Sequence, residues 1–256
     1  MRVDLLRGPV FLSIIFLCWG SFLNMLAYRL IHGNFLALRS FCPSCKHTIA
    51  WFDVVPLFSY VALGGRCRVC RQPISWLYPF IEALTAILFV LLFWRIDERF
   101  IFGFGIFFSA LIVTIRTDLE TMLISRYVTL FLVPFGWFLS FFGMIPVTLS
   151  EAVVGALSAG IFLFVVARIF AFITHKEGMG QGDIDLLMFI GSFLGFSGWW
   201  MSLLIGSLIG SLVGVGMLIL RIPCWSLKIP FGPLLAIGAI VDVFLHTQIM
   251  AFLLVS

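Results

Sequence analysis

Charged side chains are scarce in this chain, and so are polar stretches between its apolar runs. Only 11% of the 256 residues are charged, whereas 62% are hydrophobic and Phe alone contributes 30. A soluble domain of this length cannot cover so much apolar surface, so the composition excludes a soluble protein. The net charge of +4 does not indicate a nucleic-acid partner. In a membrane protein such a charge reports orientation and lipid contact.

The sequence also lacks the short alternating segments of a membrane β-barrel, because its apolar runs are long and continuous. These runs predict an all-α polytopic membrane protein with about eight transmembrane helices in the lipid bilayer, whose hydrocarbon core is ~30 Å thick. The count becomes seven if 184–221 is one broken unit. The expected spans are 9–31, 79–95, 99–116, 124–143, 149–174, 184–198, 199–221 and 231–254.

The first apolar run lacks the small-residue cleavage site of a signal peptide and is too long for one. We therefore expect residues 1–31 to contain a retained transmembrane helix. Residues 32–78 form the one polar region, and they are too few to build a large core unaided. The remaining helices, in 79–256, form the third part of the chain.

Lysine and arginine are distributed unevenly over the two sides that eight spans define. Alternate loops hold twelve of the 16, and the positive-inside rule places these loops in the cytoplasm. The polar region, Asp118 and the turn at 178–183 then share the cytoplasmic face. The twelve are Arg29, Arg39, Lys46, Arg66, Arg68, Arg71, Arg116, Arg126, Arg168, Lys176, Arg221 and Lys228.

Two CxxC pairs lie in the polar region, Cys42 with Cys45 and Cys67 with Cys70, separated by 21 residues. Four thiolates suit tetrahedral zinc, and so small a region needs a bound metal or a cross-link to stabilise its fold. Two disulfides are the alternative, but the predicted cytoplasmic side keeps thiols reduced. A site of four cysteines has no open coordination position, so we expect a structural zinc ion and not a catalytic one.

The turn Gly178-Met179-Gly180-Gln181-Gly182-Asp183 places a carboxylate at the mouth of an apolar run. A carboxylate inside a bilayer costs roughly 2.5–3.5 kcal/mol on insertion scales, so Asp183 is a candidate functional residue. The alternative is a plain helix start, with Asp183 as the N-cap that follows a glycine turn.

Asp118 is a second acid in an apolar context on the same face. Two aspartates held close share one proton, so one can activate water while the other protonates a leaving amine or polarises a carbonyl. Glu120 and Asp185 each follow two residues later and, in a helix, point to roughly the opposite side of the axis. The alternative is that Asp118 and Glu120 pair with nearby arginines across a solvated loop.

An ordered set of sequence blocks resembles the type IV prepilin peptidases, a family of bifunctional bacterial membrane enzymes. The blocks cover nearly the whole chain and follow the family order. They are Gly20-Ser21-Phe22-Leu23-Asn24 with Tyr28-Arg29, the paired CxxC, Trp51-Phe52-Asp53-Val54-Val55-Pro56 with Ser59-Tyr60, Gly65-Arg66-Cys67-Arg68, Tyr78-Pro79 with Glu82, Thr117-Asp118-Leu119, the 178–183 turn, and Pro230-Phe231-Gly232-Pro233.

The resemblance implies an aspartic endopeptidase that removes the basic leader of type IV prepilins, or of pseudopilins of type II secretion, at the cytoplasmic face of the bacterial inner membrane. Many members then methylate the new N-terminus with S-adenosyl-L-methionine, which makes 32–78 the candidate methyltransferase region. The resemblance assigns the catalytic pair to Asp118 and Asp183. The methyl-donor site stays unassigned because the chain has no GxGxxG fingerprint.

Two departures from the family pattern lie near the expected site. Where members often carry Ile-Pro-Asp, this chain has Ile124-Ser125-Arg126, which leaves Asp118 as the better candidate and Glu120 as the reserve. Where a lysine often follows GxGD by two positions, this chain has Asp185. An acid therefore replaces a cation near the expected site.

Three functions stay open at this point. The first is leader cleavage followed by methylation, and the second is a family member that only cleaves. A transporter that uses the two aspartates as a proton relay is a more distant alternative. A transporter predicts inverted repeats and charges near the bilayer midplane, whereas the acids of this chain gather at one border.

Overall fold

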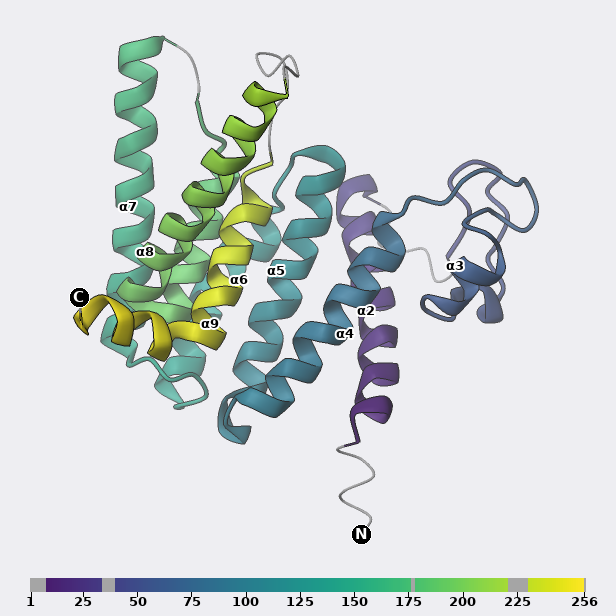
Figure 1. Ribbon diagram of the computed structural model, residues 1–256, viewed down its shortest axis with the longest axis horizontal. Coiled ribbons are helices and arrows are strands. Elements are labelled where there is room, and N and C mark those ends of the chain that lie inside the picture. The colour runs from purple at the N-terminus through teal and green to yellow at the C-terminus, as the bar shows by residue number, and fades with distance from the viewer. Residues whose placement is uncertain (1–7, 34–39, 176–177, 221–229, 256) are drawn as a thin grey trace. The chain divides into compact units, whose positions relative to one another are not determined.

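The computed structural model describes residues 8–33, 40–175, 178–220 and 230–255. Every named element in these ranges is a helix, which confirms the all-α prediction (Figure 1). The chain divides into two compact units, residues 1–101 and residues 102–256. Each unit carries one of the two candidate sites.

The first unit contains two long helices, α2 (Pro9–His32) and α4 (Leu77–Arg95). Pro9 opens α2 at a position where a missing N–H costs nothing, and Gly33 ends it in the left-handed conformation. The two helices pack closely at Gly20, where a Cβ atom would lie only 2.9 Å from the Cα atom of Glu82. Three short helices complete the unit: η1 (Trp51–Val54), α3 (Phe58–Ala62) and η2 (Glu98–Phe100).

The second unit contains five helices with an aromatic core. The Phe107 ring on α5 packs against Phe189 and Phe193 of α8, with ring centroids 5.3 and 5.1 Å apart. Residues 110–118 of α5 are all buried, which includes the polar side chains near its C-terminal end as well as the apolar ones before them. The five are α5 (Ile101–Thr121), α6 (Arg126–Phe141), α7 (Leu149–Thr174), α8 (Gln181–Ile219) and α9 (Gly232–Val255).

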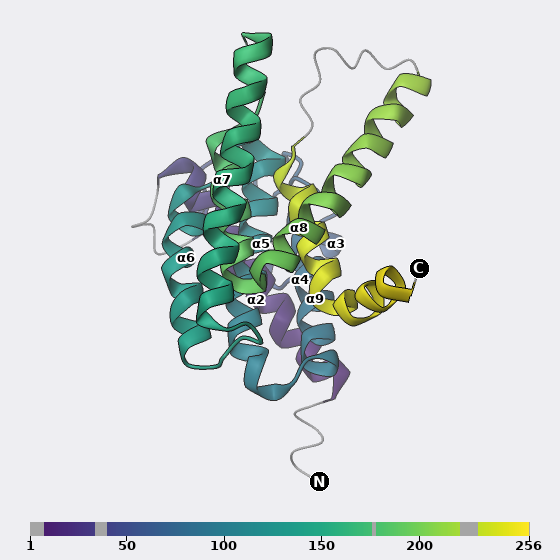
Figure 2. The same ribbon diagram turned by 90° about the vertical axis from the view of Figure 1, so that its left-hand side faces the viewer.

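Helix α8 joins the two segments that the sequence analysis separates at residue 198. Its only non-helical residue is Gly195, with φ 71° and ψ −165°, a conformation that glycine adopts without steric cost. Before this break α8 packs tightly on α7, since a Cβ on Gly155 would lie 2.5 Å from the carbonyl oxygen of Gly191. After the break the later half of α8 diverges from α7 (Figure 2).

Five stretches of the described residues are long and apolar enough to cross a membrane, and the chain is a multi-pass membrane protein. Two further apolar helices, Arg126–Phe141 and Gly232–His246, are shorter. The count of eight spans therefore remains a prediction. So does the orientation, because Arg39, Lys176, Arg221 and Lys228 lie outside the described residues. The five long apolar stretches are Val10–His32, Leu77–Arg95, Glu98–Thr121, Leu149–Thr174 and Gln181–Ile219.

Candidate aspartate site and cysteine cluster

The four predicted cysteine ligands, Cys42, Cys45, Cys67 and Cys70, lie together in the first unit. Their sulfur atoms are all within 4.8 Å of one another, and the sulfurs of Cys42 and Cys70 are 3.8 Å apart. A tetrahedral zinc ion with Zn–S bonds of about 2.3 Å places its ligand sulfurs about 3.8 Å apart. The arrangement therefore fits the ion that the sequence predicts.

The two CxxC turns have the same backbone geometry. In each, the N–H group four residues after the first cysteine donates to that cysteine's carbonyl oxygen, at 2.9 and 3.0 Å. The residue after the second cysteine, Lys46 in one turn and Arg71 in the other, has a positive φ of 58° and 60° respectively. An isolated β-bridge then closes each turn. The bridges join Phe41 to Thr48 and Arg66 to Pro73.

Backbone N–H groups aim at the first sulfur of each turn. The N–H of Cys45, with that of Ser44, lowers the pKa of the Cys42 thiol to about 6. The corresponding groups of Cys70 and Val69 lower the pKa of the Cys67 thiol. For Cys70 itself the Gln72 N–H lowers the pKa, but desolvation and the neighbouring thiols outweigh it and raise the pKa to about 11. The turns thus favour the thiolate, the form that metals bind, at the first cysteine of each pair.

A strained turn between the two CxxC pairs contacts α4. Leu57 has φ 59° and ψ −50°, and the N–H of Phe58 donates to the carbonyl oxygen of Pro56 at 2.6 Å, as in the rare positive-φ γ-turn. The N–H of Leu57 donates to the buried carboxylate of Glu82 at 2.9 Å. This carboxylate therefore holds a backbone conformation that is unfavourable on its own.

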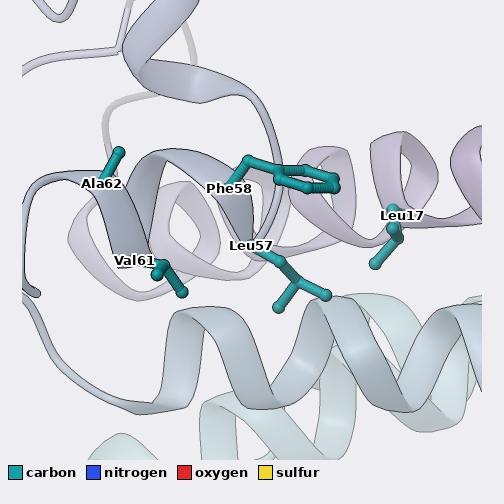
Figure 3. A pocket seen from close by; sticks show the side chains of 5 residues that line it. All are labelled: Leu17, Leu57, Phe58, Val61 and Ala62. Carbon is teal, nitrogen blue, oxygen red and sulfur yellow. The ribbon is translucent and has the colours of Figure 1, made fainter.

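An open, apolar pocket of about 550 Å³ lies beside this turn (Figure 3). Leu17 of α2 and Leu57, Phe58, Val61 and Ala62 of the turn and α3 line it. A methyl donor with a ribose and a charged sulfonium needs polar partners, and this lining offers apolar side chains alone. The pocket therefore does not assign the methyl-donor site.

Asp118 lies in the last turn of α5 and is only 4% exposed. Its Oδ2 atom accepts a hydrogen bond of 3.0 Å from the backbone N–H of Gly232, the first residue of α9. The carboxylate thus lies at a helix N-terminus, where unpaired N–H groups and the helix dipole favour an anion.

Asp183 occupies the corresponding place at the start of α8. The N-cap is Gly180, so Asp183 is the third residue of the helix and the alternative of Asp183 as N-cap is wrong. Its carboxylate turns back toward the N-cap, since a Cβ on Gly180 would lie 3.5 Å from Oδ2 of Asp183. It also lies within electrostatic range of Asp118. The structure therefore brings the two predicted aspartates together.

Ile124, in the connection between α5 and α6, packs against the glycines beside both aspartates. A Cβ on Gly182 would lie 2.7 Å from the Cβ of Ile124, and one on Gly232 would lie 3.1 Å from its Cδ1. The Gly232 Cβ would also lie 2.8 Å from Oδ2 of Asp118. Both glycines are therefore needed for close packing at this site.

The neighbouring acids point elsewhere, as their spacing predicts. Glu120 forms an ion pair with Arg116 one turn back on α5. Asp185 pairs with Arg126, whose Nε donates to its Oδ2 at 2.8 Å. Among the described residues no arginine pairs with Asp118, and the pair of Glu120 with the buried Arg116 lies within α5, so the alternative of ion pairs across a solvated loop is wrong. Arg126 and Asp185, the two residues that depart from the family pattern, are thus partners in one ion pair.

Two contributors to the site had no predicted role. Gly232 belongs to a block quoted for the family resemblance, but its spacing gave no reason to expect a hydrogen bond to Asp118. Ile124 lies in a departure from the family pattern and gave no chemical signal. A glycine at a helix start that is followed directly by a proline, here Gly232 and Pro233, indicates an exposed backbone N–H group. This signal could have predicted an anion-binding position from the sequence.

Fold and site together define a class of protein. It is an all-helical membrane protein with two aspartates near helix ends and a cluster of four cysteines. Residues 14–96 match the bacterial peptidase A24 N-terminal domain, and residues 105–215 match the type IV leader peptidase family. The chain belongs to the type IV leader peptidase family, which confirms the resemblance.

Curated relatives agree with the family match. The chain is 38% identical over 210 residues to the prepilin leader peptidase/N-methyltransferase of Aeromonas hydrophila, covering 80% of this chain and 71% of the relative. Proteins with the same name from Pseudomonas aeruginosa and Klebsiella pneumoniae are 34% and 36% identical, over 80% and 77% of this chain and 71% and 90% of theirs. No solved structure matches the chain significantly.

Proposed function

We propose that this chain is an aspartic endopeptidase that removes the basic leader from type IV prepilins or type II secretion pseudopilins. The family supports this reaction, and so does the placement of Asp118 and Asp183 at neighbouring helix N-termini, which is the observation that carries the proposal. The site faces the cytoplasm of a bacterial inner membrane, where the apolar helix of a prepilin lies in the bilayer and its basic leader meets acidic side chains.

Cleavage requires one ionised and one protonated carboxylate. The ionised aspartate takes a proton from a water molecule as its oxygen attacks the carbonyl carbon of the scissile peptide bond. The protonated aspartate donates a hydrogen bond to the carbonyl oxygen, and the leaving amine takes up a proton as the C–N bond breaks. The N–H group of Gly232 holds the Asp118 carboxylate in place for this exchange.

Methylation of the new N-terminus is the second activity that we propose, with S-adenosyl-L-methionine as the consumed methyl donor. Its support is the name of the curated relatives, together with the match of residues 14–96 to the bacterial N-terminal domain. Cys42, Cys45, Cys67 and Cys70 would fill the coordination sphere of a zinc ion, which leaves no open position for a substrate. We therefore assign the cysteine cluster a structural role in the region around 32–78.

The test is incubation of the purified full-length chain with a prepilin peptide and S-adenosyl-L-methionine, followed by mass spectrometry. We expect Asp118→Asn and Asp183→Asn each to lower the cleavage rate roughly 10²- to 10⁴-fold, because each removes a general acid or base. Asp97→Asn, at an exposed aspartate paired with Arg99, is the matched control and should cleave normally.

Two outcomes would change the proposal in different ways. Folded Asp118→Asn or Asp183→Asn protein that cleaves at the normal rate would reject the aspartate assignment. A cleaved product without the added mass of one methyl group would reject the second activity alone and favour the peptidase-only alternative.

A further inference from the structure

The ion pair between Arg126 and Asp185 joins the beginnings of two helices. Asp185 lies in the second turn of α8 with its side chain 3% exposed, whereas Arg126 is the first residue of α6 and its side chain is 60% exposed. The Nε atom of Arg126 donates to Oδ2 of Asp185 at 2.8 Å. The pair therefore compensates a carboxylate that is costly to bury alone, and it fastens α6 to α8.

The connection between α5 and α6, which precedes Arg126, lies against glycines next to both aspartates. Ile124, in the same connection and just before α6 begins, packs on Gly182, which directly precedes Asp183. It also packs on Gly232, whose N–H donates to Asp118. Any shift of the start of α6 relative to α8 would therefore change the packing beneath both carboxylates.

We propose that Arg126 and Asp185 are positioning residues for the peptidase reaction. Their ion pair holds the connection between α5 and α6 against the start of α8, and this contact fixes the spacing between Asp118 and Asp183. The inference rests on the proposed function of these two aspartates. Asp185 does not bind the basic leader, because its carboxylate is buried and already accepts a hydrogen bond from Arg126.

Neutralising the exposed partner gives the first test, since Arg126→Gln changes a side chain that is largely exposed. We expect its kcat for a prepilin peptide to fall roughly 10²-fold, the effect of a displacement of about 1 Å at a reacting centre. The KM should change little, because the pair does not touch the substrate. Arg126→Lys keeps the charge and should restore a large part of kcat.

Reversing the pair gives the second test. Arg126→Asp and Asp185→Lys alone each place two like charges together, and each should lose at least as much kcat as Arg126→Gln. The two changes combined restore opposite charges over a similar combined side-chain length. We expect the combined variant to recover at least about tenfold in kcat over either single variant, as a coupled pair does in a double-mutant cycle.

Controls separate this inference from the proposed function. Wild-type cleavage and its loss in Asp118→Asn report on the function, independently of the ion pair. Asp97→Arg, which disrupts an exposed aspartate–arginine pair elsewhere, should leave kcat unchanged. With monodisperse protein, an unchanged kcat in Arg126→Gln would overturn the positioning role. So would a combined reversal that is as inactive as the worse single variant.

Discussion

The cysteine cluster and the aspartate site differ in how far apart their parts lie along the chain. Cys42 and Cys70 are 28 positions apart, and two turns of equal geometry supply all four sulfurs. Asp118 and its hydrogen-bond donor Gly232 are 114 positions apart, and the site needs the ends of α5, α8 and α9. One site is built by local spacing and the other by helix packing.

This difference implies different sensitivities to substitution. A local cluster should depend on its four ligands and on the turns that carry them. A site assembled from helix ends should depend as well on small residues that let the helices approach.

The first prediction removes the local cluster. Cys42→Ser combined with Cys45→Ser deletes half of the ligands, so the zinc content of the purified chain should fall from about one ion to nearly none. Methylation should fall with it if the cluster organises residues 32–78. Cys18→Ser, at an exposed cysteine of α2 outside the cluster, is the control. Normal zinc content in the double variant, measured by atomic emission, would reject the ligand assignment.

The same cluster should lose metal as the pH falls. The Cys45 N–H lowers the pKa of the metal-free Cys42 thiol to about 6, and a coordinated zinc ion would lower it further. Protons compete with zinc for the thiolates, so zinc retention should decrease as the pH falls below this value. Zinc that is still retained under acid conditions that protonate zinc-bound thiolates, measured after dialysis with a chelator, would contradict the assignment.

The next prediction concerns close packing at the assembled site. Gly232→Ala adds a Cβ that would lie 2.8 Å from Oδ2 of Asp118 and 3.1 Å from Cδ1 of Ile124. We expect kcat for leader cleavage to fall roughly 10- to 100-fold because the carboxylate must move. Gly214→Ala is the matched control, since a Cβ there meets nothing within 4 Å. Zinc content should stay normal in both variants, and an equal kcat in the two would show that Gly232 is not needed for packing.

The same contrast explains what the sequence could predict. Helices followed from apolar runs, and the cysteine cluster followed from spacing, because both depend on neighbours along the chain. The partnership of Asp118 and Asp183 came from the family resemblance, since no spacing links positions on α5 and α8. Arg126 and Asp185 appeared as two separate departures, and only the packing of α6 against α8 joins them, 59 positions apart. The break in α8 at Gly195 also depends on contact with α7.

The smallest expected effect lies where the cysteine region meets α4. Glu82→Gln keeps the size of the side chain but removes the charge that strengthens the hydrogen bond from the Leu57 N–H. We expect the turn around Leu57 to lose about 1.4 kcal/mol of local stability, which corresponds to a roughly tenfold faster amide exchange in residues 51–62. Glu98→Gln, at an exposed glutamate, should leave this exchange unchanged. Equal protection of residues 51–62 in the Glu82→Gln and wild-type chains, measured by hydrogen exchange and mass spectrometry, would mean that the strained Leu57 conformation is held by the two CxxC turns and not by α4.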